Sequence, residues 1–143
     1  MLTDVLSALA DAEVRFVVTG GTAMYLHGIT RPVADLDIVV EPTGSNLSLV
    51  ASRMQEYGFY PTLPIPLSAV AVMRMLDRRG REVDVNRLYP IKYDELLADA
   101  VWVRVNNRLV AIASRSHLIA VKRQRARDYD LADVELLEDV ARE

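Results

Sequence analysis

Apolar and polar positions follow two different periods along the first forty residues, and these periods predict the first elements of the fold. Between residues 2 and 10, apolar side chains recur every three to four positions, which predicts an amphipathic helix that ends near residue 13. The β-branched and aromatic run at residues 14–18 is typical of a buried strand. It leads into Thr19-Gly20-Gly21, after which residues 22–27 have the composition of a helix closed by Gly28.

The rest of the chain alternates between strand-like and helix-like segments. A second strand is predicted at residues 35–40, and a helix over residues 45–57 with Ser45 as its N-cap. After a proline-rich loop, the pattern predicts strands at 70–76 and 82–85, a short helix at 93–99, strands at 101–105 and 109–113, and two helices from residue 116 that separate near residues 127–130. This order predicts one mixed α+β domain over residues 1–143. A central mixed sheet flanked by helices would form its core (1–113), and a short C-terminal helical segment would follow (114–143).

Composition narrows the chemistry that this domain can use. The 143 residues are 51% hydrophobic and 26% charged, which is typical of a globular protein. The absence of cysteine excludes disulfides, thiolate metal sites and a cysteine nucleophile, and the presence of only two histidines excludes a histidine-rich metal site. The formal charge of -3 excludes a protein that binds nucleic acid through a uniformly basic surface.

The sequence also bears on where the protein works. Its longest apolar runs are about five residues, far shorter than a membrane span. The N-terminal segment is acidic and lacks the apolar core and the small-residue cleavage site of a signal peptide. These features predict a soluble, cytoplasmic protein that does not contact the membrane.

Two aspartates at the start of the second predicted strand are the first candidates for chemistry. In a strand, residues i and i+2 point to the same face, so the carboxylates of Asp35 and Asp37 would project together. Neighbouring like charges are costly unless a cation lies between them, and Mg²⁺ prefers oxygen ligands of this kind. A solvated strand end explains the same pattern, and the Asp-x-Asp motif alone is a weak signal.

The glycine turn that precedes these aspartates is a candidate phosphate site. A strand that ends in Gly20-Gly21 and continues into a helix presents free backbone N–H groups at the helix N-terminus, and Thr22 adds a hydroxyl. A tight β–α turn without ligand is the alternative explanation. The spacing matches neither the G-x-G-x-x-G fingerprint nor a P-loop, so both of those nucleotide sites are excluded.

A third acid, Asp84, lies between Val83 and Val85 on the antiparallel hairpin expected beside the 35–40 strand. An acid in such a strand usually faces solvent. If its side chain shares a face with Asp35 and Asp37, three carboxylates converge, roughly 4 Å apart, and can hold two divalent ions for an in-line phosphoryl or nucleotidyl displacement.

These segments, in this order, resemble the signature of the polymerase-β-like nucleotidyltransferase superfamily. The signature consists of the glycine turn at Thr19-Gly20-Gly21, the Asp-x-Asp at Asp35-Leu36-Asp37, and the acid of Val83-Asp84-Val85. The stretch GGTAMYLHGITRPVADLDIVV is similar to small bacterial nucleotidyltransferases of toxin–antitoxin systems, including the AbiEii-like toxins. The closing segment HLIAVKRQRARDYDLADVELL is similar to their late helices, so the resemblance spans residues 14–137.

The resemblance implies a role for each of these residues. Asp35 and Asp37 would bind both of two Mg²⁺ (or Mn²⁺) ions, and Asp84 would bind the catalytic ion and help to deprotonate the acceptor hydroxyl. The β- and γ-phosphates of a nucleoside triphosphate such as ATP would lie on Gly20, Gly21 and Thr22. Arg31 would neutralise charge on the leaving pyrophosphate, although a surface arginine before a proline is an equally good explanation.

The C-terminal segment supplies further candidates. Lys122 lies at the edge of the apolar face of its helix, where it either snorkels out of the packing or reaches the triphosphate. The neighbouring arginines 123, 125 and 127 are expected to face mostly outward as a solvated stripe, which would meet an acidic partner or an RNA acceptor such as tRNA. Asp128, Asp130 and Asp133 are expected to cap helices and form salt bridges. His27 is expected to be a satisfied core histidine rather than part of the cleft.

The leading hypothesis is therefore a metal-dependent nucleotidyltransferase that moves a nucleoside monophosphate onto a hydroxyl of a tRNA, a protein or a small molecule, within a toxin–antitoxin-like system. The alternative is a catalytically inactive, antitoxin-like binding module of the same fold, and a hydrolase that uses the same metals is a third interpretation. All three acids are present, which favours the enzyme. Few residues follow Ser114, and neither Tyr89 nor Trp102 can be placed beside the cleft as a platform for the base. We therefore expect a partner protein or a homo-oligomer to complete the site.

Overall fold

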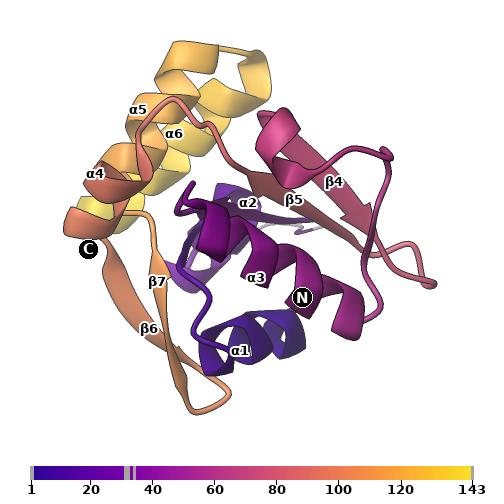
Figure 1. The fold of residues 1–143 in the computed structure, drawn as a ribbon. Helices are drawn as coiled ribbons and strands as arrows, with labels where there is room; N and C mark the ends of the chain where they lie inside the picture. The colour runs from indigo at the N-terminus through magenta and orange to yellow at the C-terminus, as the bar shows by residue number, and fades with distance from the viewer. Residues whose placement is uncertain (1, 31–32, 34, 143) are drawn as a thin grey trace.

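One seven-stranded mixed sheet runs through the computed structural model, which describes residues 2–30, 33 and 35–142 (Figure 1). Its strands lie in the order β3-β4-β5-β2-β1-β7-β6, so neighbours in the sheet are often distant in the sequence. The strands are β1 (Phe16–Thr19), β2 (Leu36–Val40), β3 (Tyr60–Pro61), β4 (Val72–Leu76), β5 (Glu82–Asn86), β6 (Val101–Val105) and β7 (Arg108–Ile112). The predicted mixed α+β fold with one central sheet is confirmed.

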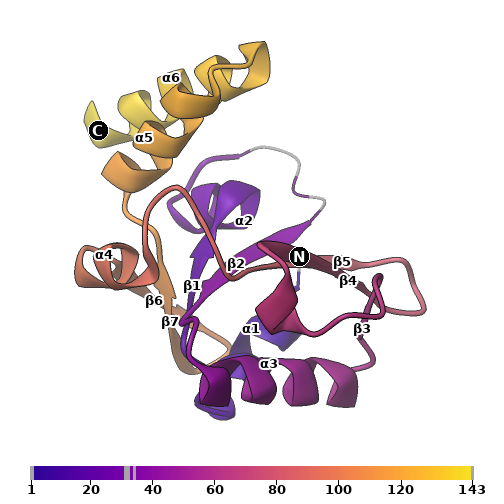
Figure 2. The ribbon, with the colours of Figure 1, turned by 45° about the horizontal axis from the view of Figure 1, so that its top comes forward.

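Helices cover both sides of this sheet. Figure 2 shows α1 and α3 together on one side, whereas α5 and α6 lie beyond the opposite side, with α2 between them and the strands. The helices are α1 (Thr3–Asp11), α2 (Gly20–Leu26), α3 (Gly44–Glu56), α4 (Tyr93–Ala98), α5 (Arg115–Arg125) and α6 (Asp128–Arg142), with a 3₁₀ turn at Leu67–Ala69. Within the described residues, no helix has both the length and the apolarity that a membrane span requires.

The core lies mainly between α1, α3 and the sheet face that they cover. Leu9 of α1 and Met54 of α3 are fully buried, as is Ile38 of β2. Along β4, Met73 is buried, whereas Val72 before it and Arg74 after it are exposed. Because side chains alternate across a strand, this pattern shows that one face of β4 packs on the core. The other face is open to solvent.

The pairing of the central strands brings polar residues into one row. β1 is antiparallel to β2, β2 is parallel to β5, and β5 is antiparallel to β4. The hairpin containing Asp84 was thus correctly placed beside β2, although β5 itself runs parallel to it. In this register Thr19 lies opposite Asp37, Asp37 opposite Asp84, and Asp84 opposite Arg74. Directly paired residues project to the same face of a sheet, so these four side chains form one row across four strands.

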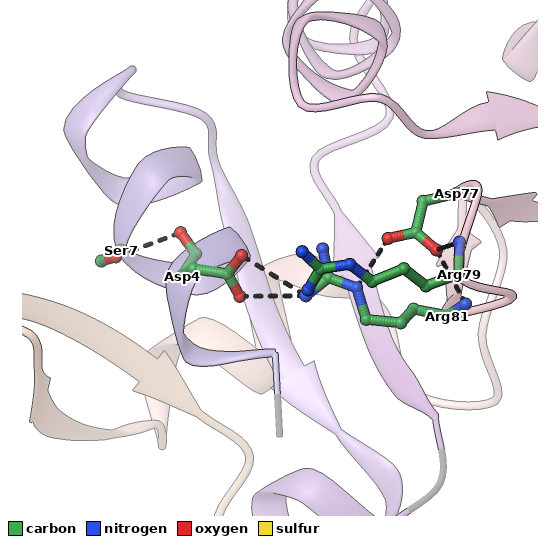
Figure 3. A network of polar contacts seen from close by, with 5 residues as sticks. All are labelled: Asp4, Ser7, Asp77, Arg79 and Arg81. Atoms are coloured by element: carbon green, nitrogen blue, oxygen red, sulfur yellow. Dashed lines mark hydrogen bonds and ion pairs between the residues drawn. The ribbon is translucent and has the colours of Figure 1, made fainter.

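The turn between β4 and β5 is fixed by a polar network that also reaches α1 (Figure 3). The Asp77 carboxylate accepts hydrogen bonds from the backbone N–H groups of Arg79 and Arg81 and from Arg81 Nε at 2.6 Å. Arg81 Nη1 also lies 3.4 Å from Asp4 Oδ2 of α1. The network holds the tight turn in place, and the turn sets the register that pairs Arg74 with Asp84.

The boundaries of the elements differ from the predictions in two informative places. The first strand begins at Phe16 rather than residue 14. The third helix begins at Gly44 after Thr43, so the prediction of Ser45 as its N-cap was wrong. The Thr43 hydroxyl donates to the Glu41 carboxylate at 3.0 Å and makes no cap hydrogen bond. The break between the last two helices falls as predicted, at Ala126, whose φ of 53° is left-handed.

Candidate active site

The three predicted acids lie on one face of the sheet, at the end nearest the glycine turn. Asp37 and Asp84 are direct neighbours in the parallel register of β2 and β5, and Asp35 immediately precedes β2. Asp84 therefore faces the same side as Asp37, which the three-carboxylate hypothesis requires. The side chain of Asp84 is only 15% exposed, so its charge is partly shielded from water.

The electrostatics of Asp37 reflect this crowding. Burial, followed by the charges of Asp84 and Asp35, raises the pKa of its carboxyl group to about 6. Lys122 and Arg125 act in the opposite direction. A carboxyl group that is held against two others in a half-buried position has the environment expected of a functional site.

An arginine that the sequence analysis did not single out completes the row on the β4 side. Arg74 Nε lies 3.1 Å from Asp84 Oδ1 and 3.5 Å from Glu82 Oε2. The signal was present in the sequence, because a tight turn at residues 77–80 places Arg74 opposite Asp84 in an antiparallel hairpin. Arg74 thus neutralises part of the charge of the third acid.

The donor set of the acid cluster fits a hard divalent cation. Asp35, Asp37 and Asp84 offer carboxylate oxygens, and the repulsion among them is what a cation relieves. In the part of the chain that the structure describes, however, no three acidic or histidine side chains are already arranged as metal ligands. The Asp84 carboxylate is engaged by Arg74 instead.

Gly20 is required by the geometry of the glycine turn. Its φ is +67°, a left-handed conformation, and an added Cβ would lie 2.7 Å from Asp37 Oδ2. Gly21, by contrast, has no atom within 4 Å of the corresponding Cβ position. The turn therefore packs directly against the Asp37 carboxylate at one glycine and leaves open space at the next.

Thr22 occupies a different position from the one predicted for a phosphate ligand. Its side chain is buried, and its hydroxyl donates to the backbone carbonyl of Asp35 at 3.1 Å. This bond ties the first turn of α2 to the start of β2. In this structure Thr22 holds Asp35 beside the glycine turn, and its hydroxyl does not project into the cleft.

Lys122 of α5 forms salt bridges with two acids of α6, the helix that packs against it. Its Nζ lies 2.8 Å from Asp133 Oδ2 and 3.8 Å from Asp130 Oδ1, and its side chain is 11% exposed. Its charge also lowers the pKa of Asp37, so Lys122 is near the acid cluster. The salt-bridge roles predicted for Asp130 and Asp133 are confirmed.

Arg123, Arg125 and Arg127 are all exposed, as predicted for the arginine stripe. The charge of Arg125 nevertheless lowers the pKa values of both Asp37 and Tyr89, so this arginine lies within electrostatic range of the acid cluster. It makes no hydrogen bond or ion pair with any residue that the structure describes. The signal was its spacing, since Arg125 follows Lys122 by three residues and shares its helix face. Arg123 pairs with Glu138, which was not predicted, and Arg127 pairs with Asp130, which fits the salt-bridge role predicted for that aspartate.

His27, Arg31 and Tyr89 are three further residues that the sequence pointed to. His27 is half-buried, and its Nε2 lies 2.7 Å from the carbonyl oxygen of Ala113, which fits the predicted structural role. Arg31 lies outside the described residues. Tyr89, which the sequence could not place, is within the cleft region, and its hydroxyl lies 2.7 Å from Thr19 Oγ1.

No model of a known protein family matches this sequence, and no curated protein matches it. Solved structures with the same fold do exist. The lincosamide antibiotic adenylyltransferase LnuA, in its lincomycin-bound structure, superposes with a TM-score of 0.70 at 12% identity, and the match covers 97% of this chain and 95% of LnuA. The antibiotic-resistance factor ANT(2'')-Ia gives a TM-score of 0.69 at 11% identity over 95% of this chain and 80% of that chain.

A third structure, the nucleotidyltransferase candidate TM1012 from Thermotoga maritima, gives a TM-score of 0.66 at 16% identity. That match covers 99% of this chain and 88% of TM1012. The chain therefore has the nucleotidyltransferase fold. At these identities the likeness concerns the fold alone, and the subtype suggested by the AbiEii-like resemblance stays a prediction.

The contrast between the two glycines makes a testable prediction about stability. We expect Gly20→Ala to lower the free energy of unfolding by about 1–3 kcal/mol, because the new methyl group meets the Asp37 carboxylate in a left-handed backbone conformation. Gly21→Ala is the matched control and should unfold within about 0.5 kcal/mol of the wild type. Urea unfolding measures both, and equal destabilisation by the two substitutions would contradict the close approach at Gly20.

The raised pKa of Asp37 makes a second prediction. An unfolded chain ionises an aspartate near pH 3.9, so the folded protein binds this proton more tightly, and Asp37 reduces stability as the pH rises from about 4 through 6. We therefore expect Asp37→Asn to stabilise the metal-free protein by about 1–3 kcal/mol at pH 8 and by about half as much at pH 5.

Unfolding in EDTA at the two pH values measures this difference. Asp99→Asn, at an acid whose side chain is 68% exposed, is the control and should have little effect. A destabilising Asp37→Asn, or a gain that does not depend on pH, would show that the carboxylates are not held together as described.

Proposed function

We propose that this protein is a metal-dependent nucleotidyltransferase that transfers a nucleoside monophosphate from a nucleoside triphosphate to a hydroxyl group, with release of pyrophosphate. The observation that carries the proposal is the convergence of Asp35, Asp37 and Asp84 beside the Gly20 turn. The nucleotidyltransferase fold of the chain supports it. A carboxylate cluster of this kind is costly in a protein without a ligand for it.

In this proposal the three carboxylates hold two Mg²⁺ or Mn²⁺ ions, which would supply charge neutralisation for the attacking and leaving oxygens. Asp35 and Asp37 contribute to both sites, and Asp84 to one. To bind the metal, the Asp84 carboxylate would have to release the Arg74 guanidinium, which it contacts in this structure. It then accepts the proton of the acceptor hydroxyl as the new phosphodiester bond forms.

The triphosphate is proposed to lie between the glycine turn and α5. The backbone N–H groups at Gly20 and Gly21 face the β- and γ-phosphates, and the open space at Gly21 leaves room for them. Arg125 is exposed and its charge acts on Asp37, so it would be available to bind the phosphates, while Lys122 adds charge from the same helix. The role predicted for Arg31 stays part of the proposal, whereas Thr22 would contact the phosphates only if its hydroxyl left the Asp35 carbonyl.

We propose a small molecule as the hydroxyl acceptor. The support is the match with LnuA, in which nearly all of this chain aligns with nearly all of an adenylyltransferase whose structure contains the antibiotic lincomycin. A tRNA or protein acceptor, as in a toxin–antitoxin system, is the alternative to be tested in the same assay. The same assay tests the antitoxin-like binding module, which would need neither the metal nor the triphosphate. It also tests whether a partner protein or a second copy of the chain completes the site.

Label transfer tests this proposal. The protein is incubated with Mg²⁺, each radiolabelled nucleoside triphosphate and, in separate reactions, hydroxyl-bearing antibiotics, bulk tRNA and candidate proteins. We expect transfer to a small molecule that falls at least about 100-fold in Asp37→Ala, while Asp99→Ala retains it. Transfer to tRNA or protein would instead show that the acceptor is a macromolecule, as in a toxin–antitoxin system. The absence of transfer, together with the absence of metal-dependent triphosphate binding, would favour the binding module.

The position of Arg125 predicts a specific binding defect. We expect Arg125→Ala to weaken Mg²⁺-nucleoside triphosphate binding about ten-fold, because it removes a charge-assisted contact to the phosphates. Arg123→Ala, two residues away on a face that pairs with Glu138, is the matched control and should change the affinity less than two-fold. Isothermal titration calorimetry measures both affinities. If the two substitutions weaken binding equally, Arg125 contributes only through the general positive charge of α5, and the proposed phosphate contact is wrong.

A further inference from the structure

A cavity of about 250 Å³ lies on the same face of the sheet as the row of Thr19, Asp37, Asp84 and Arg74, called the acid row below. Val39 forms part of its lining and is two residues from Asp37 on β2, so the two side chains project to the same face. The remaining lining comes from the segment that joins β5 to α4 and from the end of β2; it includes Pro42, Arg87, Tyr89, Lys92 and Tyr93.

Tyr89 connects this cavity with the acid row. Its ring lines the cavity, while its hydroxyl lies 2.7 Å from Thr19 Oγ1, and Thr19 is the strand partner of Asp37. Burial raises the pKa of the Tyr89 phenol, which the Thr19 hydrogen bond and the charge of Arg125 lower and the charge of Asp37 raises. The tyrosine hydroxyl is therefore held beside the strand partner of Asp37, within electrostatic range of both Asp37 and Arg125.

The glycine turn, the acid row and the cavity follow one another along the strands. Gly20 comes directly after Thr19 at the carboxyl end of β1. Val39 lies in the opposite direction from Asp37, at a distance of about 7 Å along the strand for two residues. A nucleotide has its parts in the same order, with the phosphates at one end, the ribose in the middle and the base at the other end.

We propose that this cavity is the nucleobase subsite of the enzyme, with the Tyr89 ring as the surface against which the base packs. The inference rests on the proposed function and adds to it the place of the base. Val39 and Pro42 give the cavity an apolar floor, and the hydroxyl contact with Thr19 fixes the orientation of the ring. At the rim, Lys92 offers hydrogen-bond donors and Asp94 offers acceptors to the edge of a base.

The other aromatic candidate from the sequence lies elsewhere. Trp102 of β6 is 57% exposed and lines a separate cavity of about 320 Å³ together with Phe16, Leu109 and others. None of Asp35, Asp37, Asp84 or Gly20 lines that cavity. Of Tyr89 and Trp102, Tyr89 is therefore the one that lies beside the proposed chemistry.

Comparison of nucleotides with inorganic tripolyphosphate tests the inference separately from the proposed function. Both ligands carry three phosphates and bind with Mg²⁺, but only the nucleotide has a base. In calorimetric titrations of ATP, GTP, CTP, UTP and tripolyphosphate, we expect at least one nucleotide to bind about ten-fold more tightly than tripolyphosphate. Equal binding of all five would overturn the base subsite and leave the phosphate and metal site intact. If none of the five binds, the proposed function and this inference both fail.

Three tyrosine substitutions locate the base. Tyr89→Leu should abolish the preference for nucleotide over tripolyphosphate, whereas Tyr89→Phe should retain most of it because the ring remains. Tyr57→Leu, at a tyrosine that is 42% exposed at the end of α3, is the matched control and should leave the preference unchanged. The ratio of the two affinities is the readout, since a loss of folded protein or a general change in charge affects both ligands alike. An unchanged ratio in Tyr89→Leu overturns the proposal.

A photocrosslink to the unmodified protein gives a result that does not depend on any substitution. The azido analogue of the tightest-binding nucleotide, with the azide on its base, is irradiated in complex with the protein and Mg²⁺. Trypsin cleaves after Arg87 and Lys92, so we expect the label on the peptide of residues 88–92, competed by the parent nucleotide. Competed labelling confined to α6 or to the β6–β7 hairpin would place the base elsewhere and overturn the inference.

Discussion

The repulsion among three carboxylates where β2 and β5 lie side by side is the constraint on which the rest of the site depends. Asp37 stands beside Asp84 in the parallel register and follows Asp35 by two residues, in a half-buried position. The glycine turn adapts to this charge, since only a residue without a side chain fits against the Asp37 carboxylate at Gly20. Apolar side chains at these positions would give a more stable sheet. The retained charge is therefore explained by chemistry rather than by folding.

The cations around this charge differ in how firmly they are held. Arg74 contacts Asp84 directly, and Lys122 is held by the acids of α6, whereas Arg125 has no hydrogen-bonded or ionic partner among the described residues. One cation therefore neutralises an acid, one is fixed by its own helical pair, and one is available for an anion. Among the described residues, Asp37 lacks a paired cation and Arg125 lacks a paired anion. A ligand that brings both metal ions and phosphates would supply both, because the metals neutralise the carboxylates and the phosphates accept hydrogen bonds from Arg125.

The sequence predicted the elements and the acids because both depend on local pattern. Strand alternation places Asp35 and Asp37 on one face, and a lone acid between valines marks Asp84. The parallel pairing of β5 with β2 could not be read in the same way, because the two strands are more than forty residues apart and local pattern does not encode a long-range register. The same holds for Tyr89, which lies in a connection without periodicity. The outward position of Arg125 was predicted from helix periodicity, but its proximity to Asp37 was not, because that depends on how α5 packs against the sheet.

The arrangement of the row also assigns a direction to each part of the proposed reaction. In an in-line displacement, the attacking and leaving oxygens lie on opposite sides of the phosphorus atom. The proposed phosphate site is at the β1 end of the row, so the leaving pyrophosphate would lie beside Gly20 and the acceptor would enter from the β4 end, beyond Asp84. That end is the open one, where Arg74 and Val72 are exposed on the same face. In the proposal the base lies along a third direction, down β2 toward Tyr89, and so would not obstruct the acceptor. Three separate approaches to one carboxylate cluster would allow a small sheet to bind both substrates at once.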